Sequence, residues 1–141
     1  MDQSAAQLSP DGHYVAYVSS DSGAQEIYVR DLSGAHRWQI SPNGGVGPRW
    51  SRSGKELFYV EQSKFVSVPI ATHPAFTPGT PTVLFERPYL RALTGANVSP
   101  FPEYDVSPDA QRFIVLDRPP AEPPLSIHIV HNWYAEFSSS N

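Results

Sequence analysis

The sequence predicts an all-β fold built from a repeated unit, and three observations lead to this prediction. A turn followed by an alternating apolar run occurs three times, as LSPDGHYVAYVS from residue 8, WSRSGKELFYVE from residue 50 and VSPDAQRFIVLD from residue 106. The 15 prolines and 9 glycines among 141 residues favour many turns and few long helices. No window of the sequence shows a sustained helical period of apolar residues.

The spacing of the three copies predicts that each unit is a four-stranded blade of a β-propeller. The turn serines Ser9, Ser51 and Ser107 lie 42 and 56 residues apart, and the first interval is the length of one blade. A loop insertion at about 87–102, rich in glycine and proline, accounts for the longer second interval. We expect a single propeller-repeat domain over 1–141, with blades at about 5–41, 47–86 and 103–133.

Blade one is expected to contain four strands, the first ending at Leu8 and the others at 13–19, 26–31 and 38–41. Along HYVAYVS both sets of alternating positions are largely apolar. A sheet with two apolar faces is typical of a sheet that lies between two others.

Blades two and three repeat this order. The linkers DLSGAHR and THPAFTPGT, each between a third and a fourth strand, are rich in turn-forming residues. No fourth strand is recognisable in blade three, which we expect to be incomplete. The strands are expected at 48–50, 55–62, 65–71 and 81–86 in blade two, and at 103–107, 112–118 and 126–133 in blade three.

Several of these segments are similar to a known family. The SPDG turns, the passage WQISPNGGVGPRWSRSGKELFY and the final HIVHNWYAEF resemble the TolB-type, WD-like β-propeller repeats, in particular those on the C-terminal side of bacterial serine/threonine protein kinases. The resemblance runs from Leu8 to Phe137 and implies a radial array of four-stranded blades. The sequence departs from the family at Arg52 and Ser53, where Pro-Asp is usual, and at Ala110, where glycine is usual. Kinase motifs are absent, so kinase activity is not implied.

Three blades leave two blade faces open, because closed propellers generally have four to eight blades. Open apolar faces attract other chains. One hypothesis is a homodimer that completes six blades around a two-fold axis, with Met1 to Ala6 of one copy supplying the missing strand of the other. The alternatives are that another protein covers the faces, or that the sequence is a piece of a longer protein.

Composition and charge argue against several partners and compartments. A net charge of −4 with scattered basic residues disfavours nucleic acid and anionic membranes as partners. The absence of cysteine removes disulfides and thiolate chemistry. The N-terminus has no secretory pattern and no segment approaches 18 apolar residues, so we expect a cytoplasmic protein, or a periplasmic one if the sequence belongs to a longer exported chain.

Neither a catalytic site nor a cofactor or metal site is expected. His128 and His131 lie three positions apart on an expected strand, so they project to opposite faces and do not share a metal. The turn serines and the turn aspartates Asp11 and Asp109 recur at equivalent positions, which favours a structural role. Gly-x-Ser-x-Gly and His-Glu-x-x-His are absent from the sequence.

The expected function is therefore binding. The favoured role is a non-catalytic module for protein interaction or scaffolding. A small-ligand or peptide sensor that uses the channel of a closed propeller, and an accessory propeller half for an enzyme encoded elsewhere, remain as alternatives. Trp50 is expected to fill a gap between sheets. The residues expected near an interaction surface, from their location alone, are Arg49, Trp50, Arg91, Glu103 and Tyr104.

Overall fold

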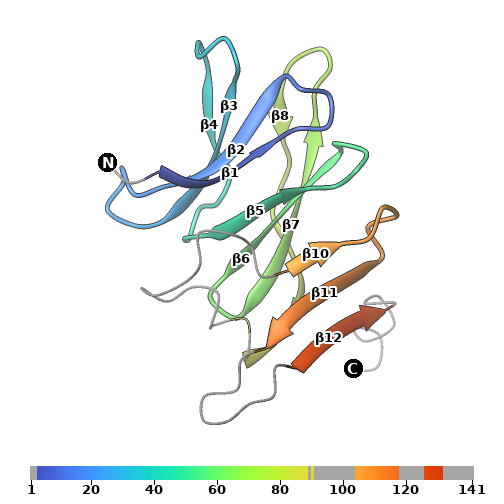
Figure 1. Ribbon diagram of the computed structural model, residues 1–141. Coiled ribbons are helices and arrows are strands. Elements are labelled where there is room, and N and C mark those ends of the chain that lie inside the picture. Colours follow the sequence, from blue (N-terminus) through green and yellow to red (C-terminus); the bar gives the residue numbers. More distant parts are fainter. Residues whose placement is uncertain (1–2, 89, 91–103, 118–125, 132–141) are drawn as a thin grey trace.

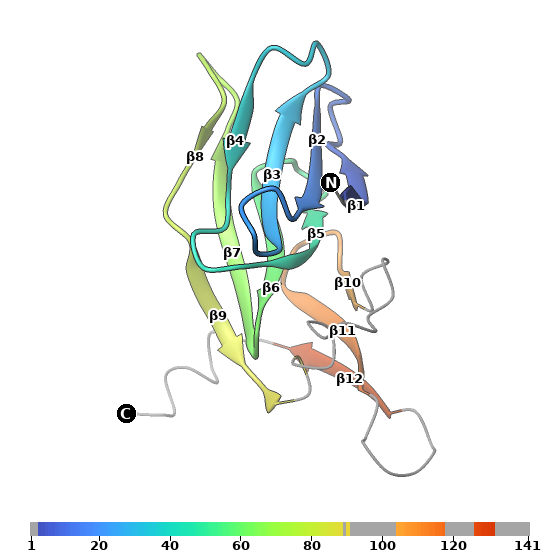
Figure 2. The same ribbon diagram turned by 90° about the vertical axis from the view of Figure 1, so that its left-hand side faces the viewer.

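The computed structural model shows an all-β chain that forms a partial β-propeller (Figure 1). It describes residues 3–88, 90, 104–117 and 126–131. Three antiparallel sheets follow one another along the chain. In Figure 1 β5 to β7 of the middle sheet lie between the first sheet, β1 to β4, and the third, β10 to β12, and Figure 2 shows the three sheets from another side.

Blade one contains the four expected strands. They are β1 (Gln3–Leu8), β2 (Tyr14–Ser19), β3 (Glu26–Asp31) and β4 (Arg37–Gln39), hydrogen-bonded in that order. The hypothesis that the N-terminal residues complete another copy's blade three is corrected here. Gln3 pairs with Ser19 and Ser4 with Val18, so this segment already serves as the inner strand of its own blade.

Blade two also has the four expected strands, β5 (Val46–Trp50), β6 (Glu56–Glu61), β7 (Lys64–Ala71) and β9 (Thr82–Glu86). A short additional strand, β8 (Thr77–Pro78), pairs with the end of β7 in the segment expected to be a linker. Phe76, just before β8, packs on Tyr14 and Trp38 of blade one with ring centroids 4.7 and 4.4 Å apart. The linker therefore helps to hold the first two blades together.

Blade three has three strands within the described residues, β10 (Tyr104–Val106), β11 (Arg112–Asp117) and β12 (Ser126–His131). Their antiparallel register places Ile114 opposite Ile129 and Phe113 opposite Val130. Most of the expected loop insertion, at 91–102, lies outside the described residues.

The repeated turn forms the same hydrogen bonds in all three blades. In blade one the N–H of Tyr14 donates to Ser9 Oγ at 3.0 Å, and the N–H of Gly12 donates to the Ser9 carbonyl at 2.9 Å. Ser9 Oγ donates to Asp11, whose pKa this bond lowers. Equivalent bonds to the backbone occur at Ser51 and Ser107. The turn serines and aspartates are therefore structural, as the repetition predicted.

The backbone conformation of the turn also explains why glycine is usual at its fourth position. Gly12 and Gly54 have φ of +74° and +71°, and Ala110 has the same left-handed conformation at +57°. A Cβ atom makes this conformation less favourable, so blade three carries a backbone strain at this turn that the equivalent turns of blades one and two avoid.

Replacing Ala110 by glycine should raise the free energy of unfolding by about 0.5–1 kcal/mol, because it removes this strain. Urea denaturation measures the change as a higher midpoint with an unchanged slope. Gly12→Ala is the matched control and should lower stability by about 1 kcal/mol through the backbone alone, since an added Cβ meets nothing within 4 Å. A lower midpoint for Ala110→Gly contradicts the explanation.

Candidate functional site

Alternating residues of the second strand of each blade face opposite neighbours. In blade two, Leu57 and Tyr59 belong to the apolar cluster shared with blade one, whereas Phe58 and Val60 belong to the cluster shared with blade three. All four side chains are fully buried. Counting from the turn serine, the sixth and eighth residues thus face the preceding blade, and the seventh and ninth face the following one.

Trp50 joins blades one and two. Its buried indole lies in the shared cluster, and its Nε1–H donates to the carbonyl of Gln7 on β1 at 3.1 Å. The sequence-based prediction that Trp50 packs between sheets is confirmed. Because the side chain is enclosed by its own chain, it is not available to a partner.

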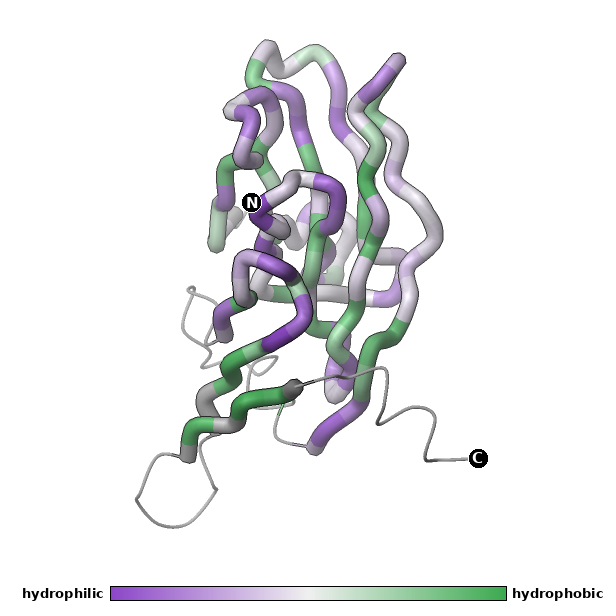
Figure 3. The backbone as a smooth tube through the Cα atoms, turned by 90° about the vertical axis from the view of Figure 1, so that its right-hand side faces the viewer, coloured by the Kyte–Doolittle hydropathy of each residue, from purple (hydrophilic) through white to green (hydrophobic). Residues whose placement is uncertain are grey.

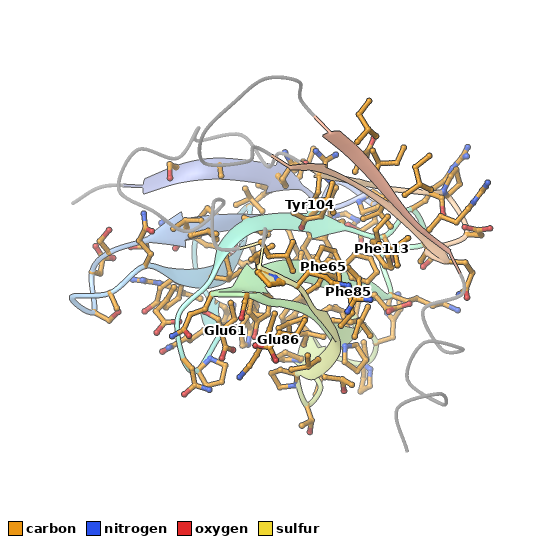
Figure 4. The ribbon with its side chains drawn as sticks, turned by 90° about the horizontal axis from the view of Figure 1, so that it is seen from below. Glu61, Phe65, Phe85, Glu86, Tyr104 and Phe113 are labelled. Atoms are coloured by element: carbon orange, nitrogen blue, oxygen red, sulfur yellow. The ribbon has the colours of Figure 1, made fainter. Side chains whose placement is uncertain are left out.

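Tyr104 joins blades two and three in a similar way. Its buried hydroxyl donates to the carbonyl of Gly47 on β5 at 2.5 Å, and burial raises its pKa. Phe65 stacks on Phe85 with centroids 5.0 Å apart and lies 4.6 Å from Phe113 of blade three (Figure 4). Tyr104 is therefore a packing residue of the junction and not part of a free surface.

Arg49 lies at the inner edge of the array, where β5 and β10 approach each other. Its guanidinium is 3.3 Å from the Asp105 carboxylate and 5.8 Å from the centre of the Tyr104 ring. Arg49 and Asp105 each lie two positions before a turn serine, a signal that could have identified Asp105 from the sequence. Of the other expected residues, Arg91 and Glu103 lie outside the described part of the chain.

One buried and one partly buried Ser–Glu contact join the ends of the third and fourth strands. In blade one the Glu26 carboxylate on β3 accepts from Ser41 Oγ and from the N–H of Gly44. In blade two the roles are exchanged, and Ser63 Oγ before β7 donates to Glu86 on β9 at 2.7 Å. These carboxylates thus have structural partners. Among the described residues no group of three or more His, Asp or Glu side chains is arranged to hold a metal ion.

The outer face of blade three carries an exposed apolar surface, which we call the isoleucine face and define as Ile114, Ile127 and Ile129. Their exposed fractions are 45, 65 and 55%. Ile114 is the seventh residue after its turn serine, and the equivalent Ala16 and Phe58 are fully buried by the following blade. Figure 3 shows the hydrophobic character of β11 and β12 at this end of the chain.

A hollow of about 360 Å³ lies beside the isoleucine face. The polar residues that line it are Asp105, Ser107 and Arg112. Ile114 and Ile129 form its apolar wall, together with Val106 and Pro108. This combination of an apolar wall and a polar rim is typical of protein-binding surfaces.

At the other end of the array lies a face of blade one that no other described blade covers, which we call the blade-one face; Val15 is half-buried there and Tyr17 is already buried. A hollow of about 430 Å³ is lined there by Val15, Tyr17 and Arg30. Val15 and Tyr17 are the sixth and eighth residues after Ser9, the positions that face a preceding blade elsewhere. Leu8, which is equivalent to Trp50, is 58% exposed.

No family model and no curated protein match the sequence. Among solved structures, it is similar to oligogalacturonate lyase from Vibrio parahaemolyticus, with a TM-score of 0.56 and 15% identity over 78% of this chain and 27% of that one. A manganese complex of oligogalacturonate lyase gives a TM-score of 0.57 and 19% identity over 82% and 29%. TolB from Acinetobacter baumannii gives 0.40 and 15% over 93% and 41%.

The likeness to the two lyase structures, which are β-propellers, shows the fold alone. This chain spans less than a third of the length of either of them. In the part of the chain that the structure describes, no helix is long and apolar enough to cross a membrane.

Truncating Trp50 to alanine should lower the free energy of unfolding by about 3–5 kcal/mol, because it empties the junction between blades one and two. Trp50→Phe should cost less, since it keeps most of the apolar volume and loses mainly the hydrogen bond to Gln7, worth about 1 kcal/mol. Thermal and urea unfolding measure both changes. Leu32→Ala, in an exposed turn, is the control and should change stability by about 0.5 kcal/mol or less. Equal losses for Trp50→Ala and Leu32→Ala contradict the assigned role.

Proposed function

We propose that the chain is a non-catalytic β-propeller module that binds protein through the isoleucine face of blade three. The observation that carries this proposal is the exposure of Ile114 at a position that blades one and two bury completely. Burying a fully exposed isoleucine side chain contributes about 1.5–3 kcal/mol. These three side chains are already about half-buried, so a partner that covers the face gains part of that amount from each of them.

The polar residues that first suggested chemistry support a binding role over a catalytic one. Ser9 and Asp11 are hydrogen-bonded to each other within a turn, and Glu26 accepts a hydrogen bond from the N–H of Gly44. Arg49 forms an ion pair with Asp105. The similarity to oligogalacturonate lyase carries no activity to this chain, because identities of 15–19% reflect the fold. A TolB-type module of the kind found beside bacterial kinases, serving as a scaffold, fits the same surface.

A photo-crosslinking amino acid at position 129 tests the proposal. A binding face should yield a crosslinked protein product at this position, identified by mass spectrometry, and excess unmodified chain should compete with its formation. Val83 is the matched control, since it is exposed and apolar but lies on β9 of blade two. Crosslinking at position 129 no greater than at position 83 overturns the proposal.

A further inference from the structure

We infer that the partner of the isoleucine face is the blade-one face of a second copy of this chain, joined head to tail. The inference rests on the proposed function, because it names the partner of the same surface. In a junction between two blades, one blade contributes the kind of face that the isoleucine face represents, and the next contributes the kind that the blade-one face represents. The chain already forms this junction twice, between blades one and two and between blades two and three.

The junction between blades two and three supplies the register. There Phe58, the seventh residue after its turn serine, packs edge-on against Phe113, the sixth residue after the next one, with ring centroids 5.3 Å apart. The same register places Ile114 of one copy against Val15 of the other. Both residues line the hollows of the open faces. The proposed contact therefore joins two surfaces, each of which contains an unfilled hollow.

The inner strands give a second argument. At each of the two junctions inside the chain, an aromatic residue on the first strand of one blade donates a hydrogen bond to a backbone carbonyl on the first strand of the preceding blade. This residue is Trp50 between blades one and two, and Tyr104 between blades two and three. Leu8 occupies the Trp50 position in blade one and is exposed, since no described blade covers it. A second copy that presents its isoleucine face would bury Leu8 where Trp50 is buried inside the chain.

Charge disfavours contact between two blade-one faces. Among the described residues, those that line the hollow of the blade-one face include Arg30 and no carboxylate. The Asp105 side chain beside the isoleucine face is 69% exposed and pairs with Arg49 at 3.3 Å, and Arg112 lines the same hollow. Joining two blade-one faces would bring two copies of Arg30 together, whereas the head-to-tail junction keeps them apart.

Two copies with three blades each form two such junctions and close a ring of six blades around a two-fold axis. No strand exchange is needed, because Gln3 and Ser4 remain in their own blade. Each copy then covers both open faces of the other. The blade faces, rather than an N-terminal segment, hold the two copies together.

Single-cysteine variants test the register, since the chain has no cysteine of its own. Val15→Cys and Ile114→Cys proteins are mixed in equal amounts and oxidised. The main crosslinked species should be the mixed 15–114 disulfide, identified on a non-reducing gel and by mass spectrometry of the linked peptides. Val83→Cys mixed with either variant is the control and should give at least tenfold less product.

Two outcomes overturn the inference. Disulfides that join position 114 to position 114, without the 15–114 product, would show identical faces in contact. An unmodified chain that remains monomeric by light scattering, with no 15–114 product, would show that a second copy is not the partner. If position 129 still crosslinks to a different protein, the binding function stands and only its partner changes. The absence of any crosslink at position 129 rejects the binding function as well.

Discussion

A sheet with two apolar faces must have a neighbour on each face, and the rest of the structure depends on this constraint. Blade two satisfies it completely, because Leu57 and Tyr59 are buried against blade one while Phe58 and Val60 are buried against blade three. Removing so much apolar surface from water is the main favourable term in such a fold. Among the described residues, blades one and three each have one such neighbour, so under the proposed function stability and binding depend on the same kind of contact.

The repeated turn matters because the two faces alternate residue by residue. A slip of one position in a strand pair would exchange the faces and expose every residue meant for a junction. The bonds from Ser9, Ser51 and Ser107 to the start of each second strand fix that position in all three blades. A polar turn at the edge of each sheet thus determines which apolar side chains meet in the interior.

The sequence alone predicted the blade order, the strands and the packing role of Trp50, because alternation and repeated turns are local signals. It missed β8 and the contact of Phe76 with Trp38, since a linker rich in proline and threonine shows no strand pattern. The ion pair between Arg49 and Asp105 joins distant parts of the chain and was not predicted. The isoleucine face became visible only when its burial was compared between equivalent blades.

The exchanged Ser–Glu contacts have a consequence for how such repeats evolve. Glu26 with Ser41 and Ser63 with Glu86 make the same kind of bond between a third and a fourth strand, with donor and acceptor on opposite partners. The strand registers show that the positions also differ, because Glu26 pairs with Ser19 as Lys64 pairs with Glu61, so Ser63 lies one residue before the equivalent of Glu26. A repeat of this kind can therefore keep a bond between two strand ends while the residues that form it change both identity and position.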